Sequence, residues 1–242
     1  MTRTRLAGVT LPVFSIRTRR DWGIGQITDL PACGAWLRRA GHSLLQILPP
    51  HELSSGETSP YGALTAFGID PVYIGLEAVP EVDVPLDDAH AAELSRLRAG
   101  RHVDYPAVRK LKLGTLRTAF DRFVAREWDR ATPRAKELAA FVDRESPWLE
   151  DLALYTVLRE DHGGFGWETW PEDERERAPL ALERVRKVAA RRILEVGYQQ
   201  WLALEQWAQA RIELLFQLLD DWLQKMHAPM IDQDGYQVPH LL

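Results

Sequence analysis

Strand-like segments are scarce in this chain, and their scarcity limits the folds that it can form. Residues 6–14 (LAGVTLPVF) and residues 43–49 (SLLQILP) are short apolar runs that are typical of buried β-strands. Residues 72–76 are a weaker third candidate, for a short strand or an extended piece. A closed eight-stranded barrel typically takes about 250 residues. The chain approaches that length with 242 residues, but the strand-like segments cover only a small part of it.

The first two strand segments flank a predicted helix. Thr28 or Asp29 can cap this helix, and Pro31 lies in its first turn. Apolar residues recur at steps of three and four over residues 30–40, and Gly41 ends the pattern. A strand, a helix and a strand in this order predict a βαβ unit with parallel strands and a right-handed crossover.

Helical patterns dominate the chain from about residue 87 onward. We expect helices over residues 88–98, 106–127, 134–160 and 179–226. The glycine-rich stretch at residues 162–179 is predicted to be a loop. Trp167 and Trp170 in this loop either form a lip that stacks on sugar or anchor the loop between helices, and we favour the anchor. The predicted fold class is therefore α/β, mostly helical by residue count.

Composition and charge exclude several classes of function. The net charge of −5 provides no basic face for nucleic acid. No run reaches the roughly 18–20 apolar residues that span a membrane, and the single cysteine, Cys33, fits a reducing compartment. We expect a cytoplasmic protein in which Cys33 is a buried structural thiol. The glycines of DWGIGQ lack the third glycine of a dinucleotide loop, and the histidines lack metal-ligand spacing, so we expect neither cofactor nor metal.

Five motifs, taken together, resemble a known family. They are GVTLPVFSIRTRRDWGIGQITDL, AGHSLLQILP, TSPYGALTAFGIDPVYIGLE, WLEDLALYTVLREDHGGFGWETWP and QQWLALEQWAQAR. In order and spacing they are similar to motifs of the 4-α-glucanotransferases of glycoside hydrolase family 77, the amylomaltases or disproportionating enzymes. The VFSIRTRRDWGIG version is most similar to the type II branch of bacteria and plants. The resemblance covers roughly residues 5–211.

This resemblance implies a (β/α)₈ TIM barrel with a large helical insertion, of which the chain holds the first strands. It divides the chain into barrel strands with a substrate loop at 1–86, a helical insertion at 87–211 and a divergent tail at 212–242. The implied reaction cuts an α-1,4 bond of a maltooligosaccharide and passes the glucan to the 4-hydroxyl of another sugar, with retained configuration. Retention requires two carboxylates about 5–5.5 Å apart.

The family's catalytic carboxylates lie on later barrel strands, in motifs such as an R-I-D-H stretch. That motif is not found in this sequence. His51 with Glu52, and Asp161 with His162, do not match it. We therefore expect no catalytic residue in this chain.

The resemblance implies a substrate-binding role for Tyr61 beneath the sugar ring, on a turn shaped by Ser59 and Pro60. From the residues alone, Tyr61 can equally pack against the protein. Asp70 stands where the family has an asparagine, and its carboxylate can still accept backbone hydrogen bonds. Trp22 is a further candidate sugar contact, for which packing is an equal alternative.

Beyond Arg211 the resemblance is lost, and an apolar stripe at helical spacing follows. Its members are Leu214, Leu215, Leu218, Leu219, Trp222, Leu223 and Met226. Three hypotheses stay open. The chain is an α-glucan transferase, a glucan-binding remnant or half of a split enzyme whose C-terminal half is a separate chain, or a helical module that dimerises through Leu215, Leu219, Trp222 and Met226.

Overall fold

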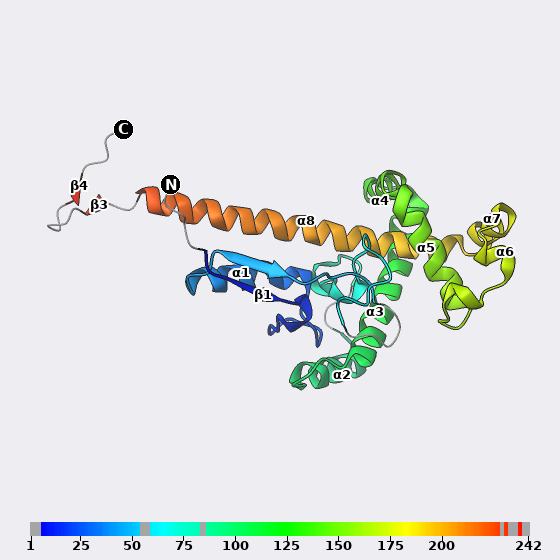
Figure 1. Cartoon of the computed structure of the whole chain (residues 1–242), viewed down its shortest axis with the longest axis horizontal. Helices are drawn as coiled ribbons and strands as arrows, with labels where there is room; N and C mark the ends of the chain where they lie inside the picture. Colours follow the sequence, from blue (N-terminus) through cyan, green and yellow to red (C-terminus); the bar gives the residue numbers. More distant parts are fainter. Residues whose placement is uncertain (1–5, 54–58, 83–85, 228–229, 232–236, 239–242) are drawn as a thin grey trace.

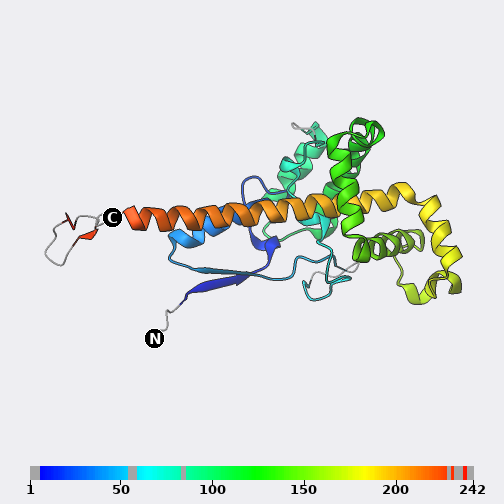
Figure 2. The same cartoon turned by 90° about the horizontal axis from the view of Figure 1, so that it is seen from above.

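One long helix organises the fold. The computed structural model describes residues 6–53, 59–82, 86–227, 230–231 and 237–238. Helix α8 spans Ala190–His227, which at 1.5 Å per residue is about 57 Å. Figures 1 and 2 show the N-terminal strands and α1 along the C-terminal half of α8, while the other helices gather around its N-terminal half.

The predicted βαβ unit is confirmed. Strand β1 (Gly8–Leu11) pairs in parallel with β2 (Leu44–Ile47), and α1 (Leu30–Arg39) connects them. Gly41 follows α1 with a φ of 83°, which glycine adopts at little cost. Helix α1 packs against α8, where Leu214 meets Gly34 and Gln217 donates to the carbonyl of Pro31.

The expectation that these two strands are buried was wrong. Exposed and partly exposed residues alternate along both strands, and Leu44 is 54% exposed. Within the described part of the chain the sheet that holds them has two strands. Both strands are therefore edges, and their apolar side chains keep solvent contact because no further strand shields them.

The third candidate, at residues 72–76, is not a strand, although Ile74 and Gly75 within it have extended backbone. Residues 71–78 form two 3₁₀ turns, η3 (Pro71–Tyr73) and η4 (Leu76–Ala78). Two glutamines of α8 satisfy the backbone on either side of η3. Gln200 accepts from the Ile69 N–H and donates to its carbonyl, both at 2.9 Å. Gln206 likewise accepts from the Gly75 N–H at 2.7 Å and donates to the Gly75 carbonyl at 2.9 Å. The segment therefore needs no neighbouring strand.

The predicted helices are confirmed, with two subdivisions. Glu145 separates α4 from α5, and Ala189 separates α7 from α8. The remaining helices are α2 (Asp88–Ala99), α3 (Tyr105–Arg126), α4 (Pro133–Arg144), α5 (Ser146–Asp161), α6 (Glu172–Arg175) and α7 (Pro179–Val188). Short 3₁₀ turns lie at Val13–Ser15, Ile27–Asp29, Trp128–Arg130 and Trp167–Thr169. Strands β3 (Met230–Ile231) and β4 (Gln237–Val238) pair antiparallel.

A single large core joins the N-terminal segment to the helices. Trp22 and Ile27 lie in the same buried cluster as Phe123 of α3 and Tyr198 of α8. A smaller cluster holds Trp170, which packs against Tyr155 and His162. This contact confirms Trp170 as an anchor of its loop, whereas Trp167 is exposed.

No helix in the described segments combines the length and the apolar character that crossing a bilayer requires. The stripe beyond Arg211 is helical to His227. Leu214 is partly buried against α1, and Leu215 is exposed. The side chains of the other stripe residues lie outside the described ones.

Candidate functional site

The chain folds back on itself directly after β2. Residues 50–53 pair antiparallel with residues 63–70 through bridges between His51 and Ile69 and between Leu53 and Ala63. The Leu64 N–H donates to the Glu52 carbonyl at 2.8 Å, and the Asp70 N–H donates to the Pro50 carbonyl at 2.9 Å. This pairing forms a base that presents residues 59–62 at the carboxyl end of a parallel strand, where the sites of α/β sheets are built.

Tyr61 lies at the tip of this segment. The Gly62 N–H donates to the Ser59 carbonyl at 3.0 Å, and the Tyr61 N–H lies 3.4 Å from Ser59 Oγ. Pro60 restricts the backbone of the same turn. The Tyr61 side chain is 75% exposed. The turn therefore holds an aromatic ring in solvent rather than in the core.

An open hollow of ≈ 300 Å³ lies beside Tyr61. It is lined by Pro49, His51, Pro60, Tyr61, Ala63, Leu64, Thr65 and Ala66. Phe67, also exposed, stacks on Trp148 of α5 with ring centroids 6.2 Å apart and an interplanar angle of 20°. The surface around the hollow is thus apolar and aromatic, which suits the C–H face of a sugar ring.

Asp70 lies in the interior, outside the lining of this hollow. It is 1% exposed, and its Oδ1 accepts from the Val72 N–H at 3.1 Å, which caps η3. Its Oδ2 pairs with Arg109 of α3 at 2.5 Å. The predicted backbone hydrogen bond of Asp70 is therefore confirmed, while its contact with sugar stays a prediction.

Trp22 is also interior. Its side chain is 2% exposed, and Nε1 donates to Glu77 Oε1 at 2.7 Å. The preceding Asp21 accepts from the N–H groups of Thr18 and Gly23, each at 2.8 Å. The DWGIGQ loop is thus packed and internally hydrogen-bonded. Tyr61 and Ser59 share one turn, whereas Trp22 and Asp70 do not line the hollow beside it; the sugar contact of Trp22 stays a prediction.

Sequence reasoning set Glu52 aside, although this residue lies in the base of the site. Desolvation, and to a smaller extent the charge of the nearby Asp70, raises the pKa of its carboxyl group to about 7. Its side chain lines a small hollow of ≈ 90 Å³ between α3, α5 and α8. Because this environment comes from helices far along the chain, the local sequence carries no signal of it.

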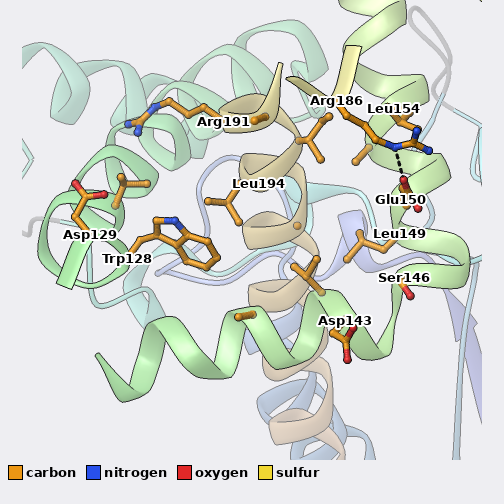
Figure 3. A pocket seen from close by; sticks show the side chains of 17 residues that line it. Trp128, Asp129, Asp143, Ser146, Leu149, Glu150, Leu154, Arg186, Arg191 and Leu194 are labelled. Carbon is orange, nitrogen blue, oxygen red and sulfur yellow. Dashed lines mark hydrogen bonds and ion pairs between the residues drawn. The ribbon is translucent and has the colours of Figure 1, made fainter. Parts of the chain in front are cut away.

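A larger cavity than these two hollows lies elsewhere, inside the helical region. It measures ≈ 770 Å³ and is lined by residues from Val124 to Gly197, mostly apolar. Figure 3 shows Trp128 and Leu194 facing into it and the Arg186–Glu150 ion pair (2.6 Å) at its border. No residue that we predicted as a sugar contact lines it.

Metal-ligating side chains do not gather in the described segments, which hold no group of three or more His, Cys, Asp or Glu with suitable geometry. Cys33 is a free thiol of intermediate exposure on α1. Burial raises its pKa, and Asp29 nearby raises it further. Its thiol is therefore a poorer nucleophile than an ordinary one.

Comparison with known proteins connects this geometry to one family. The family model described as 4-alpha-glucanotransferase matches residues 11–214. The 4-alpha-glucanotransferase of Thermus thermophilus is 34% identical over 180 residues, which are 74% of this chain and 34% of that protein. The one of Mycobacterium tuberculosis is 30% identical over 185 residues, which are 71% of this chain and 25% of that protein.

Two solved structures have a similar fold. Amylomaltase from Streptococcus agalactiae in complex with acarbose has a TM-score of 0.72 at 22% identity, over 87% of this chain and 41% of that one. Amylomaltase from Corynebacterium glutamicum has a TM-score of 0.63 at 26% identity, over 86% of this chain and 28% of that one. The chain spans about a third of the length of the curated relatives that it matches. Because the family model covers most of the sequence, the chain belongs to the 4-alpha-glucanotransferase family.

Proposed function

We propose that this chain is the N-terminal portion of a 4-α-glucanotransferase and that it binds α-1,4-glucans beside Tyr61. The observation that carries this proposal is the 75% exposed ring of Tyr61 on a proline-restricted turn at the carboxyl end of a parallel strand. The ring lies beside an apolar hollow, and an accessible aromatic face can stack on the C–H face of a sugar. The family to which the chain belongs makes an α-glucan the ligand class.

The proposal includes a fold for the whole catalytic unit. The βαβ unit would be the start of a TIM barrel, within 1–86, and the helices of 87–211 would be an insertion in it. The exposed edges of β1 and β2 support this, because an additional strand on either edge would satisfy their backbone groups. Residues 212–242 would be a divergent tail.

Each predicted sugar-contact residue has a role in this proposal. Tyr61 stacks on a glucose ring, and Ser59 holds the turn through its backbone carbonyl and hydroxyl. Asp70, paired with Arg109, fixes the end of the same segment from the interior. Trp22 supports the N-terminal loop through its bond to Glu77. Direct sugar contact by Asp70 or Trp22 would require these buried groups to become accessible.

The proposed reaction is a retaining double displacement between maltooligosaccharides, in the cytoplasm. Such a reaction requires a nucleophilic carboxylate and an acid/base carboxylate, which our sequence interpretation does not find among the motifs. A glucan-binding remnant or half of a split enzyme is therefore the main alternative. Dimerisation through the terminal stripe of α8 is the other alternative.

A binding experiment tests the glucan site. Isothermal titration calorimetry with maltoheptaose should show binding to the wild-type chain. Tyr61→Ala should weaken it by about tenfold, which corresponds to about 1.4 kcal/mol. The matched control is Phe165→Ala, which removes another exposed aromatic side chain, 68% exposed, from the loop after α5. Equal affinity of Tyr61→Ala and the wild type would overturn the assignment of the site.

A turnover experiment separates the alternatives. Release of glucose from maltotriose by the purified chain supports a transferase that works alone. Binding of maltoheptaose without release of glucose supports the remnant or the split enzyme. A dimer that Leu219→Glu dissociates, in a chain without affinity for maltoheptaose, supports the helical module.

A further inference from the structure

A pair of aromatic rings continues the surface beside Tyr61. Thr65 and Ala66 line the hollow there, and the side chain of the next residue, Phe67, is 66% exposed. The Phe67 ring stacks on Trp148 in the first turn of α5, with centroids 6.2 Å apart. Single exposed apolar residues are common on protein surfaces, whereas a contiguous apolar patch marks an interaction surface. The aromatic surface thus extends from the hollow to the helical region.

The backbone around Phe67 is fixed. Thr65 Oγ1 accepts from the Phe67 N–H at 3.1 Å and from the Gly68 N–H at 3.4 Å. Gly68 packs so closely on α5 that an added Cβ would lie 2.7 Å from Leu152 Cδ2. The segment therefore presents the ring of Phe67 from a backbone that is already ordered, which lowers the entropy lost when a ligand binds.

Trp148 is held in place at the junction of α4 and α5. Its ring packs against the main core and keeps partial exposure to solvent. Nε1 donates to Glu145 Oε2 at 2.8 Å, and Glu145 Oε1 accepts from Arg144 Nε at 2.9 Å. Because the Arg144 side chain is exposed, its Nη groups are accessible to the hydroxyl groups of a ligand. The two aromatic rings therefore have hydrogen-bond donors at their border.

We propose that Phe67 and Trp148 form a second sugar-binding platform, which takes further glucose units of the same α-1,4-glucan that contacts Tyr61. The C–H face of a sugar packs on the two rings, and Arg144 donates to its hydroxyl groups. The platform rests on the proposed function, because that function supplies the ligand class. Since a glucan repeats one sugar unit, a long chain gains contacts at both aromatic surfaces, and a short chain gains fewer.

The border of the platform favours a glucan over a protein partner. The core of a protein–protein interface is depleted in charged residues, whereas Glu145 and Arg144 are joined to the Trp148 indole by hydrogen bonds. A sugar ring carries hydroxyl groups around its edge, so it can bind charged groups beside an aromatic face without leaving them unpaired.

Isothermal titration calorimetry of the full chain with maltoheptaose tests the platform. Phe67→Ala should weaken binding by about tenfold, whereas Phe67→Tyr keeps the ring and should bind as the wild type. The matched control is Phe165→Ala, because Phe165 is similarly exposed but lies in the loop after α5. The loss in Phe67→Ala should be smaller with maltotriose, since this shorter glucan covers less of the two surfaces at once.

A direct measurement on the wild type leaves the platform unaltered. In a chain labelled with fluorotryptophan, fluorine NMR gives a resonance for Trp148, which the variant Trp148→Phe identifies by its loss. Maltoheptaose should shift this resonance in the wild type and, at higher concentration, in Tyr61→Ala. The second shift separates a sugar contact at the platform from mere support of the Tyr61 segment.

Three results would overturn the platform without touching the Tyr61 site. One is equal affinity of Phe67→Ala and the wild type for maltoheptaose. Another is a Trp148 resonance that stays in place although the wild type binds maltoheptaose. The last is equal weakening by Phe165→Ala and Phe67→Ala. A wild type that does not bind maltoheptaose would refute the proposed function and the platform together.

Discussion

The ammonium Nζ of Lys112 lies 2.7 Å from the backbone carbonyl oxygen of Ile74, and it lies at the same distance from Gln26 Oε1. Lys112 is fully buried on α3. It connects this helix to the loop before α1 and to the segment between η3 and η4. Both acceptors are neutral, so the charge lacks a direct carboxylate partner. Burial accordingly lowers the pKa of Lys112 from 10.5 to about 7, and the more distant carboxylates of Glu77 and Asp29 oppose this change.

Lys112 should therefore make stability depend on pH. Between pH 7 and pH 10.5 the unfolded chain holds a proton on this lysine that the folded chain has lost. The free energy of unfolding then rises with pH in this window, by at most about 1.4 kcal/mol per unit from this group. Urea denaturation at pH 7, 8 and 9 measures the slope.

Lys112→Met should remove this contribution to the slope. It should also lower the stability by about 1–3 kcal/mol at pH 9, because the carbonyl of Ile74 and the amide oxygen of Gln26 lose their donor. Lys136→Met, at an exposed position on α4, is the control and should keep the wild-type slope. An unchanged slope in Lys112→Met would show that Lys112 stays charged in the folded protein.

The sequence predicts local structure well where neighbouring residues determine it. The pattern of the βαβ unit and the glycine after α1 depend on residues close together in the chain, and these predictions are confirmed. The turn at residues 59–62 likewise presents Tyr61 through hydrogen bonds within these four residues. Helix breaks at Glu145 and Ala189 were missed, because the apolar pattern continues across both of them.

Predictions failed where the decisive partners are distant in sequence. The apolar residues 72–76 resemble a strand, but Gln200 and Gln206, more than a hundred residues later, satisfy the backbone instead. The burial of β1 and β2 was overestimated because apolar composition does not show how many strands flank a given strand. The environment of Glu52 depends on α3, α5 and α8, and it could not be predicted from residues 49–53.

The hydrogen bonds that Gln200 and Gln206 form with the backbone should be essential for the segment that follows Tyr61. Gln200→Leu removes both partners of the Ile69 backbone, and this should destabilise the protein by about 2–4 kcal/mol, since each buried unpaired group costs about 1–3 kcal/mol. Gln209→Leu, at an exposed position on the same helix, should change the stability by less than about 0.5 kcal/mol. Chemical denaturation measures both. A small effect of Gln200→Leu would mean that other groups replace the amide.

An ion pair between buried Glu81 and partly exposed Arg134 joins the N-terminal segment to α4 and α8. Arg134 Nε lies 3.0 Å from Glu81 Oε1, and Tyr198 Oη donates to Glu81 Oε2 at 2.9 Å. The Arg134 guanidinium also lies over the Trp201 ring at 4.5 Å. Arg134→Met should cost about 3–5 kcal/mol, because it leaves the Glu81 carboxylate buried without its counter-ion.

Tyr198→Phe removes only one hydrogen bond from the same carboxylate and should cost about 1.5–3 kcal/mol. The double variant tests whether the three residues act together. If they do, the double variant Arg134→Met/Tyr198→Phe will lose an amount of stability that differs from the sum of the losses in the two single variants by at least about 0.5 kcal/mol. Simple additivity, measured by thermal and urea denaturation, would contradict a shared network.

Two glycines provide a final pair of opposite predictions. A Cβ on Gly25, in the DWGIGQ loop, would overlap the backbone oxygens of Val13 and Ile16. Gly25→Ala must therefore displace the turn that follows β1, and it should destabilise the protein by at least about 1–3 kcal/mol. Gly114 lies within α3, and a methyl group added there would meet no neighbouring atom within 4 Å, so Gly114→Ala should stabilise by about 0.5–1 kcal/mol through helix propensity. Melting temperatures of the two variants should therefore move in opposite directions. A rise in both would show that the DWGIGQ loop yields to an added methyl group, and a fall in both would contradict the prediction for Gly114→Ala.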